Sequence, residues 1–308
     1  GRFRTFFKNR LYLPVFLRYT YGKQFFLEVL PMGLILLIIL LIAAAVVLLY
    51  LWAIRPDTRR KQHCLSFARW DFAHRGLWNM DRGIPENSLP AFWQAVRHGF
   101  AIELDVHLTK DQKIVVFHDD TLKRMCRLDR TVESLTYEEL SRYRLLNTDC
   151  RIPLLQEVLK LVNGRVPLLI ELKLPTSSTA LCPLLDRMLE TYRGQYLIES
   201  FNSLGLLWYR RHRPEILRGQ LASRYGPARG LTALLQKLST SLIVNAASRP
   251  DFVAYNYKHT RGLGFRLNHW LFKVPVFAWT IRSRSAYQQC RTRFSAVIFQ
   301  NFLPKENA

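Results

Sequence analysis

The sequence is poor in acidic residues and lacks any recognisable cysteine pattern. Of its 308 residues, 23 are Asp or Glu and 45 are Lys or Arg, which gives a formal net charge of +22 at pH 7. The five cysteines are an odd number and show neither a CxxC pair nor a cysteine–histidine spacing typical of zinc sites. Neither a zinc module nor a disulfide framework is therefore supported, and we interpret the cysteines as small buried apolar residues.

Repeats and low-complexity tracts are also absent after residue 54. No recognisable nucleic-acid-binding module accompanies the positive charge, so we expect no nucleic-acid partner. A basic surface held at a membrane attracts anionic lipid headgroups. Membrane attraction and a merely solvated basic surface are both open interpretations of the charge.

Charged residues are missing between Glu28 and Arg55. As a helix, residues 29–54 would extend about 39 Å at about 1.5 Å per residue, enough to cross a bilayer. A cleaved signal peptide would have a shorter apolar core, and a buried core helix would carry a polar stripe. We therefore expect a single membrane span, with Tyr50 and Trp52 at one interface.

The expected organisation is a basic N-terminal arm over 1–28, a transmembrane helix over 29–54, a linker over 55–62 and a catalytic domain over 63–308. The basic residues nearest the span slightly favour a cytoplasmic catalytic domain, because two precede it and five follow it. Counting the basic residues of the whole N-terminal arm removes this asymmetry. The side of the membrane that carries the catalytic domain is therefore left open. The oligomeric state is also open.

Two carboxylates stand two residues apart in the run AIELDV. On a strand, Glu103 and Asp105 project from the same face, while Leu104 and Val106 project from the other. Adjacent carboxylates repel, and an oxygen-ligated Mg²⁺ or Ca²⁺ relieves that repulsion. The following TKDQK segment predicts a hairpin that carries His118 back to a position nearly opposite Glu103.

Further candidates end two other apolar runs. His74 is a second candidate for proton transfer, and Arg75 offers a planar fork for a phosphate. The run VPLLIELK ends in Glu171, a third carboxylate, with Lys173 on the same face. Together these residue types describe a metal-assisted phosphoryl-transfer site.

Strand and helix patterns alternate over the remaining sequence, which predicts a parallel α/β architecture. We expect strands near 69–74, 101–106, 166–171, 196–201, 216–221, 252–256, 276–280 and 296–300. Their number is that of a closed (β/α)8 TIM barrel, which takes roughly 250 residues. The hairpin arm and the segment that follows it form an insertion after the second strand.

Five motifs, in order, resemble the glycerophosphodiester phosphodiesterase family: HRG at 74–76, PENS at 85–88, ELDV at 103–106, VVFHD at 115–119 and IELK at 170–173. The similarity is weaker in ESFN at 199–202, AWT at 278–280 and the AVIFQN strand. The family implies a TIM barrel with a metal at the carboxyl ends of its strands.

The resemblance implies roles for five residues, and the chemistry of the residues themselves suggests four more. Glu103, Asp105 and Glu171 would bind one divalent cation, Mg²⁺ or Ca²⁺, and His74 and His118 would form the acid/base pair, with the acid and the base not assigned to either. Substrate or phosphate contacts would involve Arg75, Lys173, Glu86 and Trp279, although Glu86 also reads as a helix-capping residue and Trp279 as a barrel-wall residue. Gln300-Asn301 departs from the Thr-Asp type of pair usual in the family.

Three functions follow from this pattern. The first is metal-dependent hydrolysis of glycerophosphodiesters to glycerol 3-phosphate and an alcohol. The second is lysophospholipase D action on membrane lysophospholipids. The expected single membrane span and the attraction of the basic surface to anionic lipids favour this second function. The third is an inactive, membrane-tethered lipid-binding barrel, against which stands the presence of every expected acid, base and ligand.

Overall fold

Nine strands form one sheet in which eight run parallel. A computed structural model describes residues 32–223 and 230–304; the expected basic arm and the first residues of the expected span lie outside these ranges. The strands are β1 (Asp71–His74), β2 (Ala101–Leu108), β3 (Ile114–Val116), β4 (Leu168–Leu172), β5 (Tyr196–Ser200), β6 (Arg218–Ala222), β7 (Phe252–Asn256), β8 (Val276–Ile281) and β9 (Ala296–Phe299).

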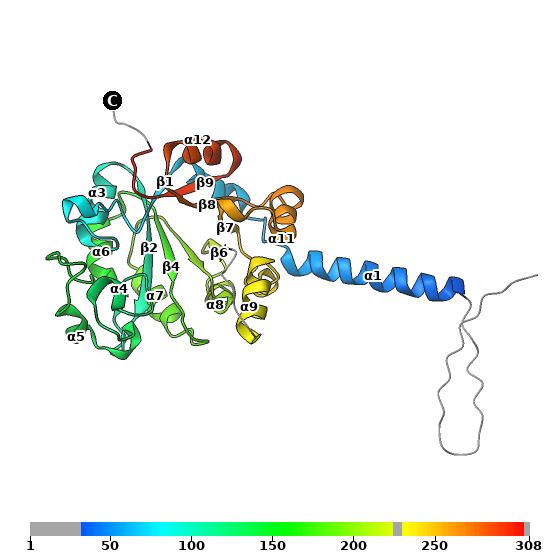
Figure 1. Cartoon of the computed structure of the whole chain (residues 1–308), viewed down its shortest axis with the longest axis horizontal. Helices are drawn as coiled ribbons and strands as arrows, with labels where there is room; N and C mark the ends of the chain where they lie inside the picture. Colours follow the sequence, from blue (N-terminus) through cyan, green and yellow to red (C-terminus); the bar gives the residue numbers. More distant parts are fainter. Residues whose placement is uncertain (1–31, 224–229, 305–308) are drawn as a thin grey trace, which may run out of the picture. The chain divides into compact units, whose positions relative to one another are not determined.

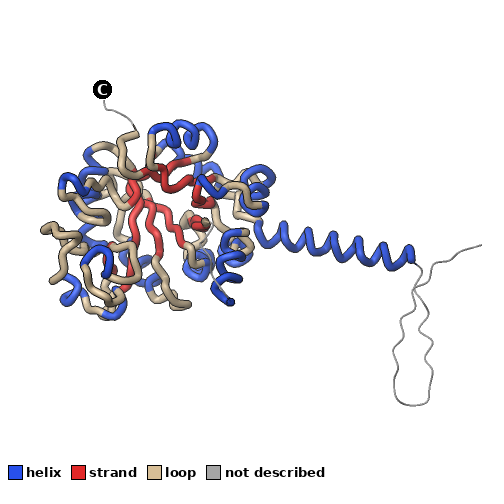
Figure 2. The backbone as a smooth tube through the Cα atoms, viewed as in Figure 1, coloured by secondary structure: helices blue, strands red, loops and turns tan. Residues whose placement is uncertain are grey.

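The parallel strands close into a barrel. Their order is β1-β9-β8-β7-β6-β5-β4-β2, and a further pairing of β1 with β2 joins the two ends. β3 pairs antiparallel with β2 at the edge of this circle. Figure 2 shows the strands gathered inside a surrounding layer of helices. The structure thus confirms the predicted (β/α)8 TIM barrel.

Helices follow most strands and cover the barrel (Figure 1). The α-helices are α1 (Met32–Ile54), α2 (Lys61–Leu65), α3 (Leu89–Arg97), α4 (Lys123–Cys126), α5 (Tyr137–Ser141), α6 (Leu155–Val162), α7 (Leu181–Leu189), α8 (Ser203–His212), α9 (Gly230–Thr240), α10 (Asn245–Ser248), α11 (Leu263–Arg266) and α12 (Arg284–Arg293). Short 3₁₀ or π turns are η1 (Ser66–Arg69), η2 (Met80–Arg82), η3 (Val132–Ser134), η4 (Tyr257–His259) and η5 (Leu267–Leu271).

Alternation along each strand divides the apolar residues into two cores. Phe72, Leu169 and Phe277 point into the barrel and form part of one buried cluster. Leu104 and Val106 belong to a second cluster that packs the sheet against its helices. Since successive side chains point to opposite faces, Glu103 and Asp105 fall on the inner face, as their spacing predicts.

The insertion after β2 has a small core of its own. It comprises β3, α4, η3 and α5, and its buried apolar side chains form a third cluster that includes Phe117, Leu122 and Leu140. The Thr136 hydroxyl caps α5 by accepting a hydrogen bond from the Glu139 amide. In turn, the Glu139 carboxylate accepts a hydrogen bond from the Thr136 amide. This packing fixes the segment that carries His118.

Strands β1, β4 and β6 each begin two residues later than expected, and at β1 the cause can be identified. The strand begins at Asp71 rather than near residue 69, because Ser66–Arg69 forms a 3₁₀ turn that buries Phe67 in the barrel interior. Helix α3 begins directly after Ser88, and the Ser88 hydroxyl accepts a hydrogen bond from the Ala91 amide. Such a cap stabilises a helix by about 1 kcal/mol.

Two compact units divide the chain, residues 1–52 and residues 53–308. In the first unit, the described part of α1 is apolar throughout and long enough to cross a membrane. In the second, the segment expected as a linker bonds to the barrel: the Asp57 amide donates to the Pro250 carbonyl at 2.8 Å, and the Arg60 guanidinium pairs with Asp251 at 2.6 Å.

Candidate active site

The carboxyl ends of the first strands bring the predicted site residues to one level. His74 at the end of β1 pairs in register with Glu103 on β2. Asp105, two residues further along β2, pairs with Glu171 on β4. Parallel pairing therefore places residues far apart in the sequence within reach of one another at the mouth of the barrel.

Three carboxylates form the centre of this mouth. One oxygen from each of Glu103, Asp105 and Glu171 lies within 4.8 Å of the others, and all three residues are buried. Burial, and then the neighbouring Asp105 carboxylate, raise the pKa of Glu103 well above its usual range. Burial likewise raises the pKa of Glu171. An all-oxygen set of this kind fits a hard divalent cation such as Mg²⁺ or Ca²⁺.

Lys173 partly compensates the carboxylate charge. Its ammonium lies 2.6 Å from a Glu171 oxygen and 3.0 Å from an Asp105 oxygen. Burial alone would raise the pKa of Asp105, but Lys173, His118 and Arg75 lower it well below its ordinary value. Asp105 is therefore the most strongly ionised of the three acids.

Arg75 sits on a turn that its neighbours constrain. Its backbone has a φ of 61°, and Gly76 follows with a φ of 80°. A Cβ at Gly76 would lie 2.9 Å from the Ala91 backbone, so only glycine fits between this turn and α3. The turn directs the Arg75 amide to Glu103 at 2.8 Å and its guanidinium to Glu86 at 2.7 Å.

His74 contacts an amide on one side and the carboxylates on the other. Its Nδ1 lies 2.6 Å from the Gln300 side-chain oxygen, and its Nε2 lies 4.0 Å from Glu103. An amide oxygen only accepts, so Nδ1 carries the hydrogen and a neutral ring leaves Nε2 with a free lone pair. Burial, and then the Arg75 charge, hold the pKa of His74 well below its usual range.

His118 has a different partner. Its Nδ1 lies 2.6 Å from an Asp119 carboxylate oxygen. Burial opposes ionisation of Asp119, but hydrogen bonds from His118 and Arg124 lower its pKa below the ordinary value. The ring of His118 is thus oriented by a carboxylate, whereas the ring of His74 is oriented by an amide.

Arg124 links the two sides of the mouth. Its guanidinium lies 2.7 Å from Asp119 and 2.6 Å from Glu86. Because Glu86 also accepts from Arg75, an unbroken chain of ion pairs runs from the His118 partner to Arg75. Glu86 thus holds two arginines in place.

The strands that follow β4 form the other wall of the mouth. The cavity has a volume of about 130 Å³, and its walls are His74, Arg75, Glu103, His118, Glu171, Glu199, Phe201, Leu221, Trp279, Thr280, Arg282 and Ile298. Trp279 lies in this wall and packs edge-on against Phe201, with ring centroids 5.8 Å apart. The structure therefore brings all the predicted residues except Glu86 and the ion-paired Asp105 and Lys173 directly to this cavity, and those three contact residues that line it.

Glu199 is a site residue that our sequence reasoning did not select. It pairs in register with Glu171 across β4 and β5 and is 1% exposed. Its Oε2 atom makes no hydrogen bond within the described part of the chain. Burial, and then the Glu103 charge, raise the pKa of Glu199 well above its usual range.

Three further contacts were also absent from the predicted site. Gln300 bonds His74, Asp119 bonds His118, and the Asn87 amide donates to Asp105 at 2.8 Å. Glu199 and Gln300 each stand at or next to the end of a predicted strand, which is the one sequence signal that could have indicated them.

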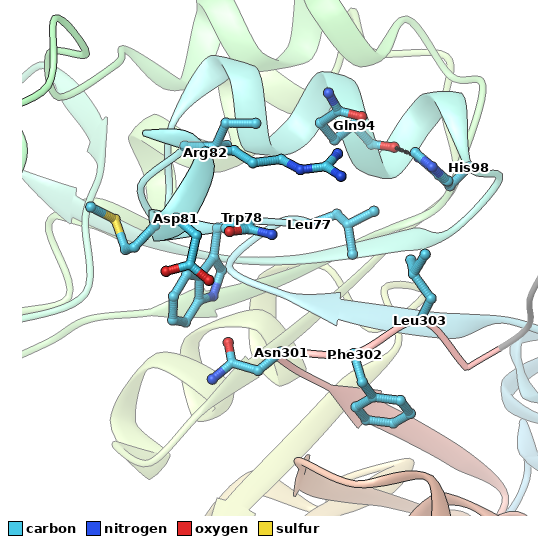
Figure 3. A pocket seen from close by; sticks show the side chains of 12 residues that line it. Leu77, Trp78, Asp81, Arg82, Gln94, His98, Asn301, Phe302 and Leu303 are labelled. Carbon is cyan, nitrogen blue, oxygen red and sulfur yellow. Dashed lines mark hydrogen bonds between the residues drawn. The ribbon is translucent and has the colours of Figure 1, made fainter.

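A second cavity, of about 450 Å³, begins beside the His74 turn (Figure 3). It lies between the segment from Leu77 to Ile84, the α3 side chains Gln94 and His98, and the residues after β9. In Figure 3 the Arg82 side chain extends toward Gln94, while Asp81 lies on the side of Trp78 and Asn301. Two of its lining residues, Leu77 and Asn301, directly follow the His74 turn and Gln300 in the sequence.

Fold and site together define a β/α-barrel phosphodiesterase, with acidic residues and two histidines at the carboxyl ends of its strands. The family model described as the glycerophosphoryl diester phosphodiesterase family matches residues 74–301. The chain therefore belongs to that family.

Relatives match in sequence over different lengths. A glycerophosphodiester phosphodiesterase of Bacillus altitudinis is 41% identical over 113 residues, 34% of this chain and 45% of the relative. YhdW of Bacillus subtilis (strain 168) is 31% identical over 227 residues, 69% of this chain and 86% of YhdW. Lysophospholipase D GDPD1 of Rattus norvegicus is 33% identical over 152 residues, 45% of this chain and 46% of that protein. The match thus spans about half the length of two of these relatives.

Solved structures share the fold. A phosphodiesterase of Oleispira antarctica, solved with the product sn-glycerol-3-phosphate, superposes with a TM-score of 0.61 at 23% identity, over 76% of this chain and 94% of that one. A glycerophosphodiester phosphodiesterase of Thermotoga maritima gives a TM-score of 0.56 at 24% identity, over 74% and 92% of the two chains. At these identities the likeness concerns the barrel itself.

Proposed function

We propose that this protein hydrolyses glycerophosphodiesters to glycerol 3-phosphate and an alcohol. The observation that carries the proposal is that two histidines line one cavity at the barrel mouth together with Glu103 and Glu171, which form a buried carboxylate cluster with Asp105. The family of the chain supports the substrate class, and sn-glycerol-3-phosphate is the product bound to the Oleispira antarctica phosphodiesterase.

A divalent cation would be held by Glu103, Asp105 and Glu171. When bound, it would neutralise phosphodiester oxygens and the negative charge that develops on them. Arg75 and Lys173, which already contact these acids, supply fixed positive charge beside the same position. Because the Arg75 and Lys173 side chains are held in place at the strand ends, they would stabilise the developing charge without having to reorganise. Such electrostatic stabilisation is usually the largest single contribution to an enzyme's rate enhancement.

The histidine partners suggest how the proton roles divide. His74, neutral and with a free Nε2, accepts a proton from the attacking hydroxyl. His118, whose Nδ1 is oriented by the Asp119 carboxylate, donates a proton to the leaving alkoxide. The attacking group is either water or the substrate's own glycerol hydroxyl, which would form a cyclic phosphate first.

Product analysis tests this function. Purified full-length protein should release glycerol 3-phosphate from a soluble diester such as glycerophosphocholine, and a chelator should abolish release until Mg²⁺ or Ca²⁺ is restored. An inactive lipid-binding barrel would bind the diester and release nothing with either ion. Phosphocholine in place of glycerol 3-phosphate would place cleavage on the other side of the phosphorus and would contradict the proposal.

Lysophospholipase D action is a second candidate function. It is favoured by the apolar helix α1, which would keep the enzyme at the membrane where lysolipids reside, and by the relative named lysophospholipase D GDPD1. If a lysolipid is the natural substrate, kcat/KM on lysophosphatidylcholine in bilayers should exceed that on glycerophosphocholine. The opposite ranking would leave the soluble diester as the substrate.

We also propose that residues 29–54 cross the membrane once. The described part of this segment has a mean hydropathy of 3.4 and none of its most apolar window is buried. A signal sequence near the N-terminus has the same appearance, so retention of the segment in the mature protein is the deciding observation. Mass spectrometry of membrane-extracted protein should find the intact segment, and protease protection of sealed vesicles would identify the face that carries the barrel.

A further inference from the structure

The segment between β7 and β8 exposes large apolar side chains on one side of a short helix. In α11 and η5, Leu263, Trp270 and Leu271 are 61%, 68% and 56% exposed. Phe265 and Asn268, on the opposite side, are buried. Helical spacing gathers the exposed three on one face, so the segment is amphipathic with its apolar face outward. We call Leu263–Leu271 the β7–β8 surface segment.

Tight packing against the barrel fixes the inner side of this segment. A Cβ at Gly264 would lie 2.0 Å from the Ser241 carbonyl oxygen, so glycine is required for the contact. Asn268 donates to the Gly264 carbonyl at 3.0 Å and lies 3.4 Å from Asn245. Because the inner face is held in this way, the outward direction of the apolar face is set by the fold.

Ile54, the last residue of α1, is hydrogen-bonded to a residue that also contacts the β7–β8 surface segment. Asn245, whose amide contacts Asn268, also donates to the Ile54 carbonyl at 2.9 Å. Ile54 is fully buried and belongs to the barrel unit. A single asparagine therefore joins Ile54, the last residue of the proposed span, to Asn268 of the β7–β8 surface segment.

Charge favours an anionic surface as the occupant of this face. No acidic residue occurs between Asp251 and Glu306. The exposed Arg261, Arg266 and Lys273 lie within or directly beside the β7–β8 surface segment. Tryptophan and leucine flanked by arginine and lysine are typical of helices that lie in the headgroup region of a membrane.

We infer that the β7–β8 surface segment is a second membrane contact, which lies in the headgroup region of an anionic bilayer and fixes the orientation of the barrel. The inference rests on the proposed membrane span and not on the proposed catalysis. It gives Trp270 and Leu271 a lipid environment, and Arg266 and Lys273 phosphate partners.

Lipid-borne quenching tests the inference on the full-length protein in vesicles. Vesicles of anionic and zwitterionic phospholipid should contain phospholipids brominated near the headgroup. Trp52 at the end of α1 and Trp270 would be the two lipid-exposed tryptophans, so Trp270→Phe should remove about half of the quenchable fluorescence. Trp93→Phe is the matched control, because Trp93 is 43% exposed on α3, and it should leave the quenching unchanged.

Charge reversal provides a second measurement. Arg266→Glu should lower the quenching of Trp270 in anionic vesicles and leave it unchanged in purely zwitterionic ones. Equal quenching of wild type and Trp270→Phe would overturn the inference. So would a Trp270 that lipid does not quench and that becomes shielded from acrylamide as protein concentration rises, since a second copy would then cover the face.

An alkaline carbonate wash separates failure of the span from failure of the surface contact. If the protein resists the wash but Trp270 is not quenched, the membrane span is supported and the surface contact is contradicted. If Trp270 is quenched but the wash removes the protein, the surface contact is supported and the membrane span is contradicted.

Discussion

Two glutamates on neighbouring strands show how differently the two halves of the barrel mouth are built. Glu171 on β4 and Glu199 on β5 are paired in register and both buried. Glu171 contacts Lys173 and lies among the carboxylates that could share a cation. Glu199 has an oxygen with no hydrogen-bond partner among the described residues and a pKa well above its usual range.

The contrast extends to the strands on either side. β1, β2 and β4, with the segment after β3, supply both histidines, the three clustered acids, Arg75 and Lys173. The later strands supply mainly uncharged wall residues, among them Phe201, Leu221 and Trp279. One half thus carries the charge that the proposed reaction needs, and the other shapes the space beside it. A residue's role here follows from its partners rather than from its type.

The largest expected effect comes from Glu171→Gln. The amide keeps the shape but removes one ligand charge and the ion pair with Lys173, so activity should fall on the order of 10³-fold. Steady-state hydrolysis of glycerophosphocholine with saturating Mg²⁺ or Ca²⁺ measures it. Unchanged turnover would remove Glu171 from the site.

His118→Ala should have the next largest effect on activity. Loss of one proton-transfer group lowers rates by about 10²–10⁴-fold, while a side chain at the barrel mouth contributes little to the core. Single-turnover rates and thermal unfolding should be measured together, with the exposed His212→Ala on α8 as the control. A variant that unfolds, yet keeps wild-type specific activity in its folded fraction, would make His118 a structural residue.

Cation binding to the three carboxylates should stabilise the folded protein, and this stabilisation should be larger at higher pH. The raised pKa values of Glu103 and Glu171 mean that the folded protein without metal holds these protons more tightly than the unfolded chain. That stabilisation is present below their ordinary value of 4.5 and is lost as pH rises through the raised values.

Asp105 stays charged across this window, because its pKa is lowered. At about 100-fold excess over its Kd, a cation should add about 2.7 kcal/mol, or roughly 5–10 °C in Tm. Thermal scans with cation and with chelator should show a smaller difference near pH 5 than near pH 7.5. A difference that grows as pH falls would contradict the carboxylate site.

The smallest effect should come from Glu199→Gln, the direct counterpart of Glu171→Gln. Glu199 lies outside the three-carboxylate cluster, and its Oε2 atom has no hydrogen-bond partner among the described residues. An amide of nearly the same shape should therefore change kcat/KM by less than about threefold. A loss as large as that of Glu171→Gln would make Glu199 a further charged member of the cluster, and the two halves of the mouth would no longer differ.

Short-range patterns were enough to predict the barrel. Alternating strand and helix runs and the TKDQK hairpin are local features, and each lies within a few residues of where it was expected. The spacing of Glu103 and Asp105 also placed them on one face, because a strand alternates with a period of two. Boundaries such as the start of β1 were missed because burial of Phe67 in the interior decides them.

The sequence by itself determined which chemical groups this protein has and at which strand ends they stand. Only the tertiary structure decided their distant partners, which are Gln300 for His74 and Glu86 for Arg124. Parallel strand pairing joins residues more than two hundred positions apart, and no local periodicity encodes such contacts. The proposed division of the proton roles and the raised pKa of Glu199 depend on those partners and on burial, because the environment of an ionisable group shifts its pKa.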